Sequence, residues 1–569
     1  MSDDMAIAYS STDESRRVLG KILNLYSKDT NSLIPLVHQQ LENVHFKSQR
    51  DFPYFPIPFK ETETASALKA IEGITAGMLA NLKAGTPDQK RKVTVDLEKA
   101  TAFLFQTYLA TVGGLSKLDP KVKSLLKDTD LLQAQSNQYR RMSANLFETK
   151  RPGEYYHIHG SLEASKTLRM IGLEPFRPDL KTHEDIVDTI EGAVKGFTIE
   201  ELESMNAENR QAGVPALTYE GFLETAHGRA NSKLPPWTVE NLEYNSPPTP
   251  LGRDGDTRPL AGIKVLELCR IIAGPIITRI LGEYGADVLK ITSPHLSDVP
   301  FFQVDGNMGK HAAELDLKTP EGKAQFEKLL ADVDIMVDGY RPGAFEKLGY
   351  GTKSLSELAA KRGKGIIYVN ENCFGYEGEW ANRPGWQQIA DCVSGVAWAQ
   401  GKFMGLSEPV VPPFPISDYG TGCMGAIAAL TGLYHRTTQG GSWHGKTSLL
   451  HYDLLLFHMG LYPKQVQDEL KALAGEDFLK LRHSNSVDQI SGTALLDMKE
   501  KFPEFFARKD LYDRWYSAAY KADIVAVNPV VEIKGVKTGF RRASRPNGSD
   551  APTWNFGEDE DYRKSLDGE

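Results

Sequence analysis

The sequence has few cysteines and no long hydrophobic run. Its four cysteines lack the C-x-x-C spacing of a zinc site, and they are too few to hold a chain of 569 residues together by disulfides. No apolar stretch approaches the roughly 20 residues that span a bilayer. The acidic N-terminus also lacks the apolar centre of a secretory signal. We therefore expect a cytoplasmic protein without a membrane partner.

Positive charge is not in excess. Lys and Arg number 66 against 75 Asp and Glu, which gives a formal net charge of −9, and the two signs are interspersed. This balance excludes a broad basic surface for nucleic acid. The length allows roughly two to four domains with ample buried core.

Short β-branched runs alternate with helical patterns beyond residue 258. The expected strands are residues 263–268, 287–291, 335–339 and 366–370. Alternation at this spacing predicts an α/β fold with a doubly wound, mainly parallel sheet. Thr319 is the expected N-cap of one helix, with Pro320 at its first position. A stretch rich in Pro, Gly and Asp at 245–258 predicts a linker before this region.

The N-terminal half has a different pattern. Helices are expected at 65–84, 94–115 and 161–172, a strand at 155–160, and two more helices within 183–210. These elements predict a smaller α/β unit between longer helices. Residues 68–106 also resemble 424–460 faintly, which indicates either an old duplication or the convergence of two amphipathic segments.

Gly420, Gly422 and Gly425 form a G-x-G-x-x-G pattern just after Asp418. A dinucleotide site requires a strand directly before such glycines and an acid about 20 residues later. Prolines precede them instead, and no acid follows before Asp453, so the dinucleotide interpretation fails. Asp418 is then either the cap of a helix over 420–436 or a nucleophile that attacks an activated acyl group.

Several motifs together resemble family III CoA-transferases. The segment "RPLAGIKVLELCRIIAGPIITRILGEYGADVLKITSP" (258–294) is similar to the opening of that family, and the likeness covers about 260–455. Asp418 occupies the place of the family's nucleophile. The resemblance implies a transferase that moves CoA between an acyl-CoA and a carboxylic acid through aspartyl anhydride and aspartyl-CoA thioester intermediates. It also implies CoA as a substrate, with no permanently bound cofactor and no metal.

The same resemblance suggests residues that contact CoA. They are Arg270, Ala273, Tyr340, Arg341, Lys347, Trp386 and Gln387. Tyr340 would stack on adenine, while Arg341 and Lys347 would meet phosphates; alternatively, "RPG" only turns the chain and these cations are solvated. Racemases of the family carry His and Asp where this chain has Trp386 and Gln387, so racemisation is not expected.

The order of segments departs from the family. Residues 144–230 resemble its small domain, which normally follows the large one. This order suggests a degenerate first copy over 1–250 and a second copy over 258–569 that carries the nucleophile. Family III subunits form interlocked dimers, so we expect either a homodimer or a fused pseudo-dimer. Glu61 lies near the position that matches the nucleophile in the first copy, which we expect to be inactive.

Two further features leave alternatives open. No Gly-rich loop that could cover the intermediate occurs near 134–153. His157 and His159 share a face of the expected strand, but without a third ligand they are better explained as structural residues. The alternative functions are an acyl-CoA isomerase or lyase on the same scaffold and a non-catalytic acyl-CoA-binding or scaffold protein.

Overall fold

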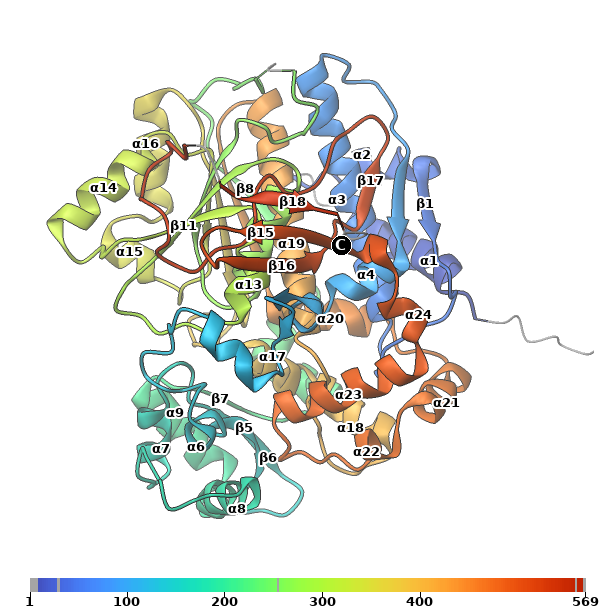
Figure 1. The fold of residues 1–569 in the computed structure, drawn as a ribbon, viewed down its shortest axis with the longest axis vertical. Coiled ribbons are helices and arrows are strands. Elements are labelled where there is room, and N and C mark those ends of the chain that lie inside the picture. The colour runs from blue at the N-terminus through green and yellow to red at the C-terminus, as the bar shows by residue number, and fades with distance from the viewer. Residues whose placement is uncertain (1–8, 28–30, 253–254, 558–559, 566–569) are drawn as a thin grey trace, which may run out of the picture.

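A seven-stranded sheet forms the centre of the protein (Figure 1). The computed structural model describes residues 9–27, 31–252, 255–557 and 560–565. The strands, in spatial order, are β11 (Lys310–Glu314), β10 (Asp287–Thr292), β9 (Lys264–Leu268), β12 (Ile335–Asp338), β13 (Ile367–Asn372), β14 (Ser442–Ser448) and β8 (Trp237–Glu243). The first six run parallel and β8 is antiparallel to β14. The expected mixed α/β fold with a parallel sheet is confirmed.

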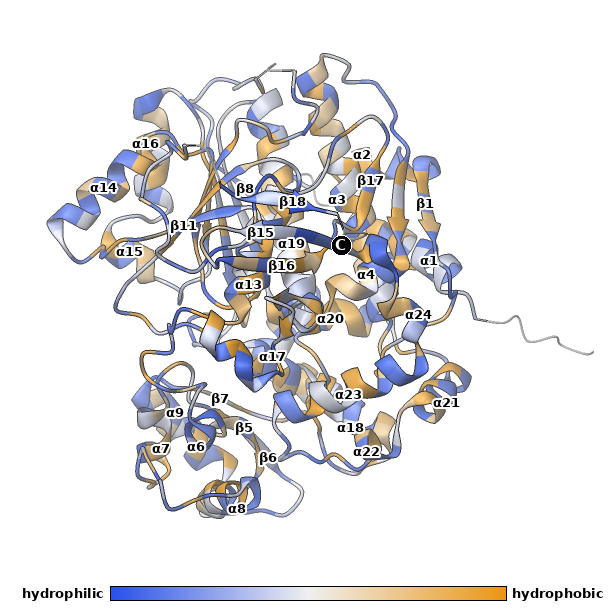
Figure 2. Ribbon diagram, viewed as in Figure 1, coloured by the Kyte–Doolittle hydropathy of each residue, from blue (hydrophilic) through white to orange (hydrophobic). Residues whose placement is uncertain are grey.

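Helices cover both faces of this sheet because alternate strand residues point to opposite sides. Val265 and Val337 belong to one hydrophobic core together with α12 (Ala273–Glu283) and α19 (Ile416–Thr438). Leu266 and Met336 belong to a second core with α14 (Pro320–Leu330) and α16 (Thr352–Arg362). Figure 2 shows hydrophilic and hydrophobic residues on both α14 and α16, as expected for helices with one face against a sheet.

The structure also bears on two local expectations, a helix cap and an irregular segment. Thr319 caps α14 through a hydrogen bond from the Gly322 amide, and Pro320 is the first helical residue. The described part of the expected linker, 245–252 and 255–258, forms neither helix nor strand. No helix in the described ranges combines the length and the apolar character needed to cross a membrane.

The glycines of α19 allow close packing between helices. A Cβ atom on Gly422 would lie 2.5 Å from Ile276 Cγ2 of α12, and one on Gly425 would lie 2.4 Å from Ile277 Cδ1. A Cβ on Gly420 would lie 2.0 Å from the ring of Tyr452, in α20 (Leu449–Met459). The three glycines thus bring α19 against α12 and α20.

The cap interpretation of Asp418 is wrong. Helix α19 begins at Ile416, two residues earlier than Asp418, and Pro415 is its N-cap. Asp418 therefore lies inside the first turn, where its side chain is free to face away from the helix end.

The N-terminal half interleaves with the C-terminal half. Helix α3 (Glu61–Ala84) packs along α19, and β2 (Val93–Asp96) pairs with β1 (Val44–Lys47) and with β17 (Val531–Ile533). The expected helix over 94–115 is wrong, because this segment contains the end of β2, α4 (Leu97–Phe103), α5 (Gln106–Leu109) and β3 (Thr111–Val112). Pairing with strands distant in sequence overrides the local helical pattern.

A smaller unit lies at the lower left of Figure 1. Its antiparallel sheet contains β5 (Ala144–Glu148), β6 (Tyr155–His159) and β7 (Ala212–Pro215). Helices α7 (Ala164–Met170), α8 (His183–Val194) and α9 (Ile199–Asn209) complete it around its own hydrophobic core. The expected strand at 155–160 and the two helices within 183–210 are confirmed.

Candidate active site

A cavity of about 530 Å³ opens at the carboxyl ends of β9, β12 and β13. Ligands of open α/β sheets commonly bind at this edge, outside the strand ends. The wall is formed by the loops after these strands, by the start of α19, and by residues 108–162 of the N-terminal half. Both halves of the chain therefore build the same cavity.

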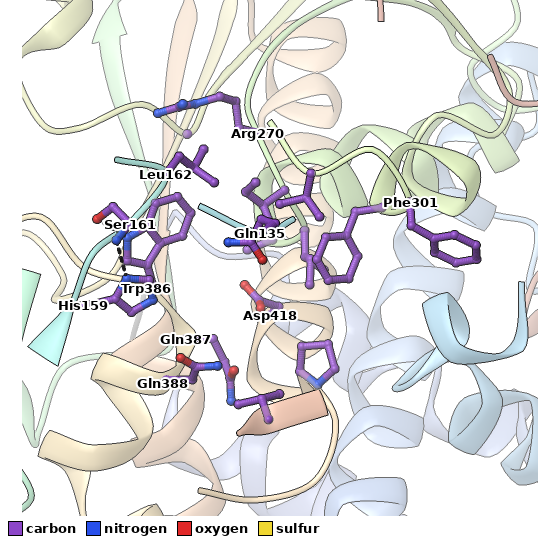
Figure 3. Close-up of a pocket in the computed structure, with 18 of the residues that line it drawn as sticks. Gln135, His159, Ser161, Leu162, Arg270, Phe301, Trp386, Gln387, Gln388 and Asp418 are labelled. Atoms are coloured by element: carbon purple, nitrogen blue, oxygen red, sulfur yellow. Dashed lines mark hydrogen bonds between the residues drawn. The ribbon is translucent and has the colours of Figure 1, made fainter. Parts of the chain in front are cut away.

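Asp418 points into this cavity from the first turn of α19 (Figure 3). The backbone amide of Ala273, the first residue of α12, interacts with this side chain and favours its ionised form. Burial, and then the nearby charge of Asp453, raise the pKa of Asp418 to about 8. A helix N-terminus favours the carboxylate form, but here the loss of hydration outweighs it. The cavity thus holds a carboxyl group that is mostly protonated at neutral pH.

A second carboxyl group, Glu371, lines the cavity from the end of β13. Burial and the charge of Asp418 raise the pKa of Glu371 to about 8. Two carboxyl groups in one cavity do not readily ionise together, because the negative charge of one raises the pKa of the other. Glu371 was not among the residues expected from the sequence, because a single acid at the end of a strand has no characteristic spacing.

A further pair of acids lies buried behind Asp418. The hydroxyl of Ser417 is 3.0 Å from Asp391 Oδ1 and 2.7 Å from Asp453 Oδ1. A hydroxyl donates only one proton, so it cannot satisfy two carboxylates at once. The pKa of Asp391 and that of Asp453 are both raised by burial, the latter to about 7. The pair therefore retains a proton near neutral pH.

Six of the seven residues expected to contact CoA line the cavity. They are Arg270, Ala273, Tyr340, Arg341, Trp386 and Gln387. The guanidinium of Arg270 lies 5.4 Å from the centre of the Tyr340 ring and donates to the Ser297 carbonyl at 3.0 Å. Lys347 is exposed on α15 (Ala344–Leu348) and is not part of the cavity wall.

A loop from the N-terminal half forms part of the opposite wall. The buried Asp130 carboxylate accepts from the backbone amides of Ala134, Gln135 and Ser136 at 3.0, 2.9 and 2.7 Å. Gln135 and Ser136 line the cavity, and Figure 3 shows Gln135 pointing into it. This wall is anchored by a carboxylate instead of being built from a run of glycines.

The histidines of β6 differ in their surroundings. His159 lines the cavity, whereas His157 is buried behind it and is absent from the lining. Among the residues that the structure describes, no group of three or more His, Cys, Asp or Glu is arranged to hold a metal ion.

Comparisons with known proteins identify relatives of this chain. The model of "CoA-transferase family III" matches residues 260–536. An acetyl-coenzyme A transferase, nodX of Hypoxylon pulicicidum, is 32% identical over 518 residues, which cover 88% of this chain and 86% of the relative. An acyl-CoA transferase of Gibberella moniliformis is 29% identical over 503 residues, which cover 86% and 87% of the two chains. A CAIB/BAIF family protein from Brucella suis is 28% identical and covers 34% of this chain and 54% of that chain, with a TM-score of 0.30. The chain belongs to CoA-transferase family III.

Proposed function

We propose that Asp418 is the nucleophile with which this CoA-transferase moves CoA from an acyl-CoA donor to a carboxylic acid acceptor. The observation that carries this proposal is the position of Asp418. It is half-buried at a helix start, its carboxyl group points into a 530 Å³ cavity, and the backbone amide of Ala273 favours its ionised form. An ionised carboxylate in such a site can attack a thioester carbonyl carbon.

The chemistry takes four balanced steps. An oxygen of Asp418 bonds to the acyl carbon of the donor, the C–S bond breaks, and CoA leaves as a thiolate. The thiolate attacks the aspartyl carbon of the anhydride, which releases the donor acid and leaves an aspartyl-CoA thioester. The acceptor carboxylate attacks that thioester, expels the thiolate and forms a second anhydride with Asp418. The thiolate then attacks the acceptor's acyl carbon, forms the new acyl-CoA and restores Asp418.

The surrounding groups support these steps. The Ala273 amide favours the ionised form of Asp418 and can stabilise negative charge on its oxygen. The raised pKa of Asp418 makes its carboxylate more nucleophilic once ionised, although a smaller fraction is ionised at neutral pH. The free energy needed to remove this proton before attack therefore adds to the activation barrier.

CoA itself is proposed to enter past the loops after β9 and β12. Tyr340 offers an aromatic face, and Arg270 and Arg341 offer positive charge at the cavity rim. Lys347, outside the cavity wall, would reach only a phosphate that extends beyond the rim. From β9 the chain adds β10 and β11 on one side of the sheet, and then β12, β13 and β14 on the other side. This change of side between β9 and β12 supports the doubly wound, Rossmann-like arrangement and a ligand at that point.

We also propose that residues 1–250 descend from a degenerate first copy and 258–569 from a second. The long helices α3 and α19 pack against each other, and Glu61 begins α3 near the position that corresponds to Asp418. Glu61 is buried and accepts from the Tyr452 hydroxyl at 3.0 Å. Such a carboxyl cannot reach a substrate, so only the second copy would be active in this fused pseudo-dimer.

Covalent trapping tests the nucleophile. The enzyme is incubated with acetyl-CoA and then with hydroxylamine, and its peptides are examined by mass spectrometry. We expect a hydroxamate on the peptide that contains Asp418. The label should disappear in Asp418→Asn and persist in Glu371→Gln, which makes the same charge change in the same cavity.

The rival functions give different results. A non-catalytic binding protein would bind acetyl-CoA without any label. An isomerase or lyase would convert acyl-CoA without moving CoA to an added carboxylic acid. Full transfer activity in Asp418→Asn would refute the proposed mechanism.

A further inference from the structure

The end of β6 fixes the proton of His159 on one ring nitrogen. The backbone amide of Ser161 donates to His159 Nδ1 at 2.9 Å. A nitrogen that accepts a hydrogen bond carries no proton, so the proton of this neutral imidazole lies on Nε2. The hydrogen-bond geometry alone therefore assigns the tautomer.

The turn that makes this contact is tightly constrained. Ser161 has φ 54°, in the left-handed region that side chains seldom adopt. A Cβ on Gly160 would lie 2.1 Å from Ser143 Oγ and 3.0 Å from Ala164 Cα, so only glycine fits there. The position of the Ser161 amide relative to His159 is thus determined by the backbone.

The imidazole ring is held between two other rings. The ring of His159 stacks on His157 with centres 5.6 Å apart and on Trp386 with centres 5.5 Å apart. The planes are inclined by 23° and 15° respectively. Trp386 Nε1 donates to the Ser161 hydroxyl at 2.9 Å, which ties the stack to the same turn. Figure 3 shows His159, Trp386 and Ser161 together at the cavity wall.

His159 is not a proton carrier in this site. Burial, and then the positive charges of His157 and Arg141, hold the pKa of His159 well below its ordinary value. Protonation would also place a second N–H against the donating amide of Ser161. The ring consequently remains neutral across the working pH range.

The Nε2–H group is available to a ligand. Among the described residues none accepts a hydrogen bond from it, and His159 lines the same cavity as Asp418. Nε2 is not fully enclosed by protein atoms, so its N–H group is open to the cavity. A fixed, neutral donor in a cavity with two carboxyls suits an oxygen that becomes negative during reaction.

We propose that His159 Nε2–H donates a hydrogen bond to the carbonyl oxygen of the acyl group and strengthens that bond as the oxygen becomes an oxyanion. This inference rests on the proposed function and assigns a catalytic residue to the half of the chain that lacks the nucleophile. Negative charge shifts from the attacking carboxylate to the carbonyl oxygen and then leaves on the CoA thiolate when the C–S bond breaks, so His159 neither gains nor loses a proton.

Three variants separate donation from packing. In His159→Gln, the amide nitrogen replaces Nε2 and still donates, so transfer of CoA from acetyl-CoA should stay within about tenfold of wild type. In His159→Phe, the ring still stacks on Trp386 but cannot donate, so kcat should fall by about 100-fold. His157→Phe is the matched control, since it changes the neighbouring stacked ring outside the cavity, and it should keep the wild-type kcat. Equal rates for His159→Phe and wild type, or equal losses for all three variants, would overturn the proposal.

Nuclear magnetic resonance gives a readout that does not need turnover. Asp418→Asn protein with ¹⁵N-labelled histidine is titrated with acetyl-CoA, and the His159 signals are identified by their loss in the double variant with His159→Gln. We expect a protonated Nε2 that does not titrate between about pH 6 and 9, and a shift of its signal on adding acetyl-CoA. An unprotonated Nε2, or no shift with saturating acetyl-CoA, would refute the inference. Failure of the proposed function would appear separately, as absence of hydroxylamine trapping in the wild-type enzyme.

Discussion

Replacing Asp418 by Asn should stabilise the folded protein at alkaline pH. An aspartate in the unfolded chain has a pKa of about 4, whereas burial raises the pKa of Asp418 in the folded protein to about 8. The folded state therefore binds this proton more tightly than the unfolded state. The stability that this proton contributes is present below about pH 4 and is lost as the pH rises to about 8. The variant has no such proton, so its advantage over wild type grows across that window.

The size of the effect follows from the pKa difference. Four pKa units at 1.36 kcal/mol each set an upper limit of about 5 kcal/mol. Glu371 titrates in the same range, and Asp418 is only half-buried, so part of this cost is shared or screened. We expect the difference in free energy of unfolding between variant and wild type to grow by about 2–3 kcal/mol from pH 5 to pH 8.5.

Urea denaturation at these two pH values measures the difference. The control is Asp468→Asn, which removes an exposed carboxylate from α21 (Lys464–Leu473) that pairs with Lys464. Its effect on the free energy of unfolding should be small at both pH values. A gap between Asp418→Asn and wild type that stays constant or narrows with rising pH would refute the reasoning.

Three other predictions concern packing, the second carboxyl and the cavity wall. Gly420→Ala should lower the free energy of unfolding, measured by urea denaturation, by about 1–3 kcal/mol, because its Cβ would overlap the Tyr452 ring. The control Gly192→Ala, in open space on α8, should raise it by up to about 1 kcal/mol. Glu371→Gln should shift the rise of kcat/KM with pH to lower pH, since Glu371 and Asp418 then no longer compete for ionisation. An unchanged profile would contradict this coupling. Asp130→Ala should raise the KM for acetyl-CoA by about tenfold, because three backbone amides of the cavity wall lose their acceptor. The circular dichroism spectrum should stay unchanged. An unaltered KM would show that the loop does not need this anchor.

Local patterns were sufficient for the parts of the fold that depend on local chemistry. The strands β9, β10, β12 and β13 carry β-branched runs, and the cap of α14 has Thr319 followed by Pro320, so both were visible in the sequence. Asp418 was found because a lone acid stands just before the small residues, at the place of the nucleophile in the family that the motifs resemble. Its helix begins at Ile416, four residues earlier than expected, which removed the cap alternative.

Other features depend on contacts between distant segments. The expected helix over 94–115 failed because Val93–Val95 pair with residues 531–533, near the other end of the chain. His159 is stacked on Trp386, which follows it by more than two hundred residues, so no local pattern reveals the stack. Glu371 is a single acid without characteristic spacing, and its importance appears only when α19 places Asp418 in the same cavity.

The cavity wall that bears His159 and Gln135 and the helix that bears Asp418 belong to one continuous polypeptide. Their encounter is intramolecular, so dilution cannot separate them and their effective concentration stays constant at any copy number. Activity per chain would then be insensitive to enzyme concentration. A single chain also lets a mutation change the wall without altering the surroundings of Asp418 in duplicate, a freedom that two identical subunits lack.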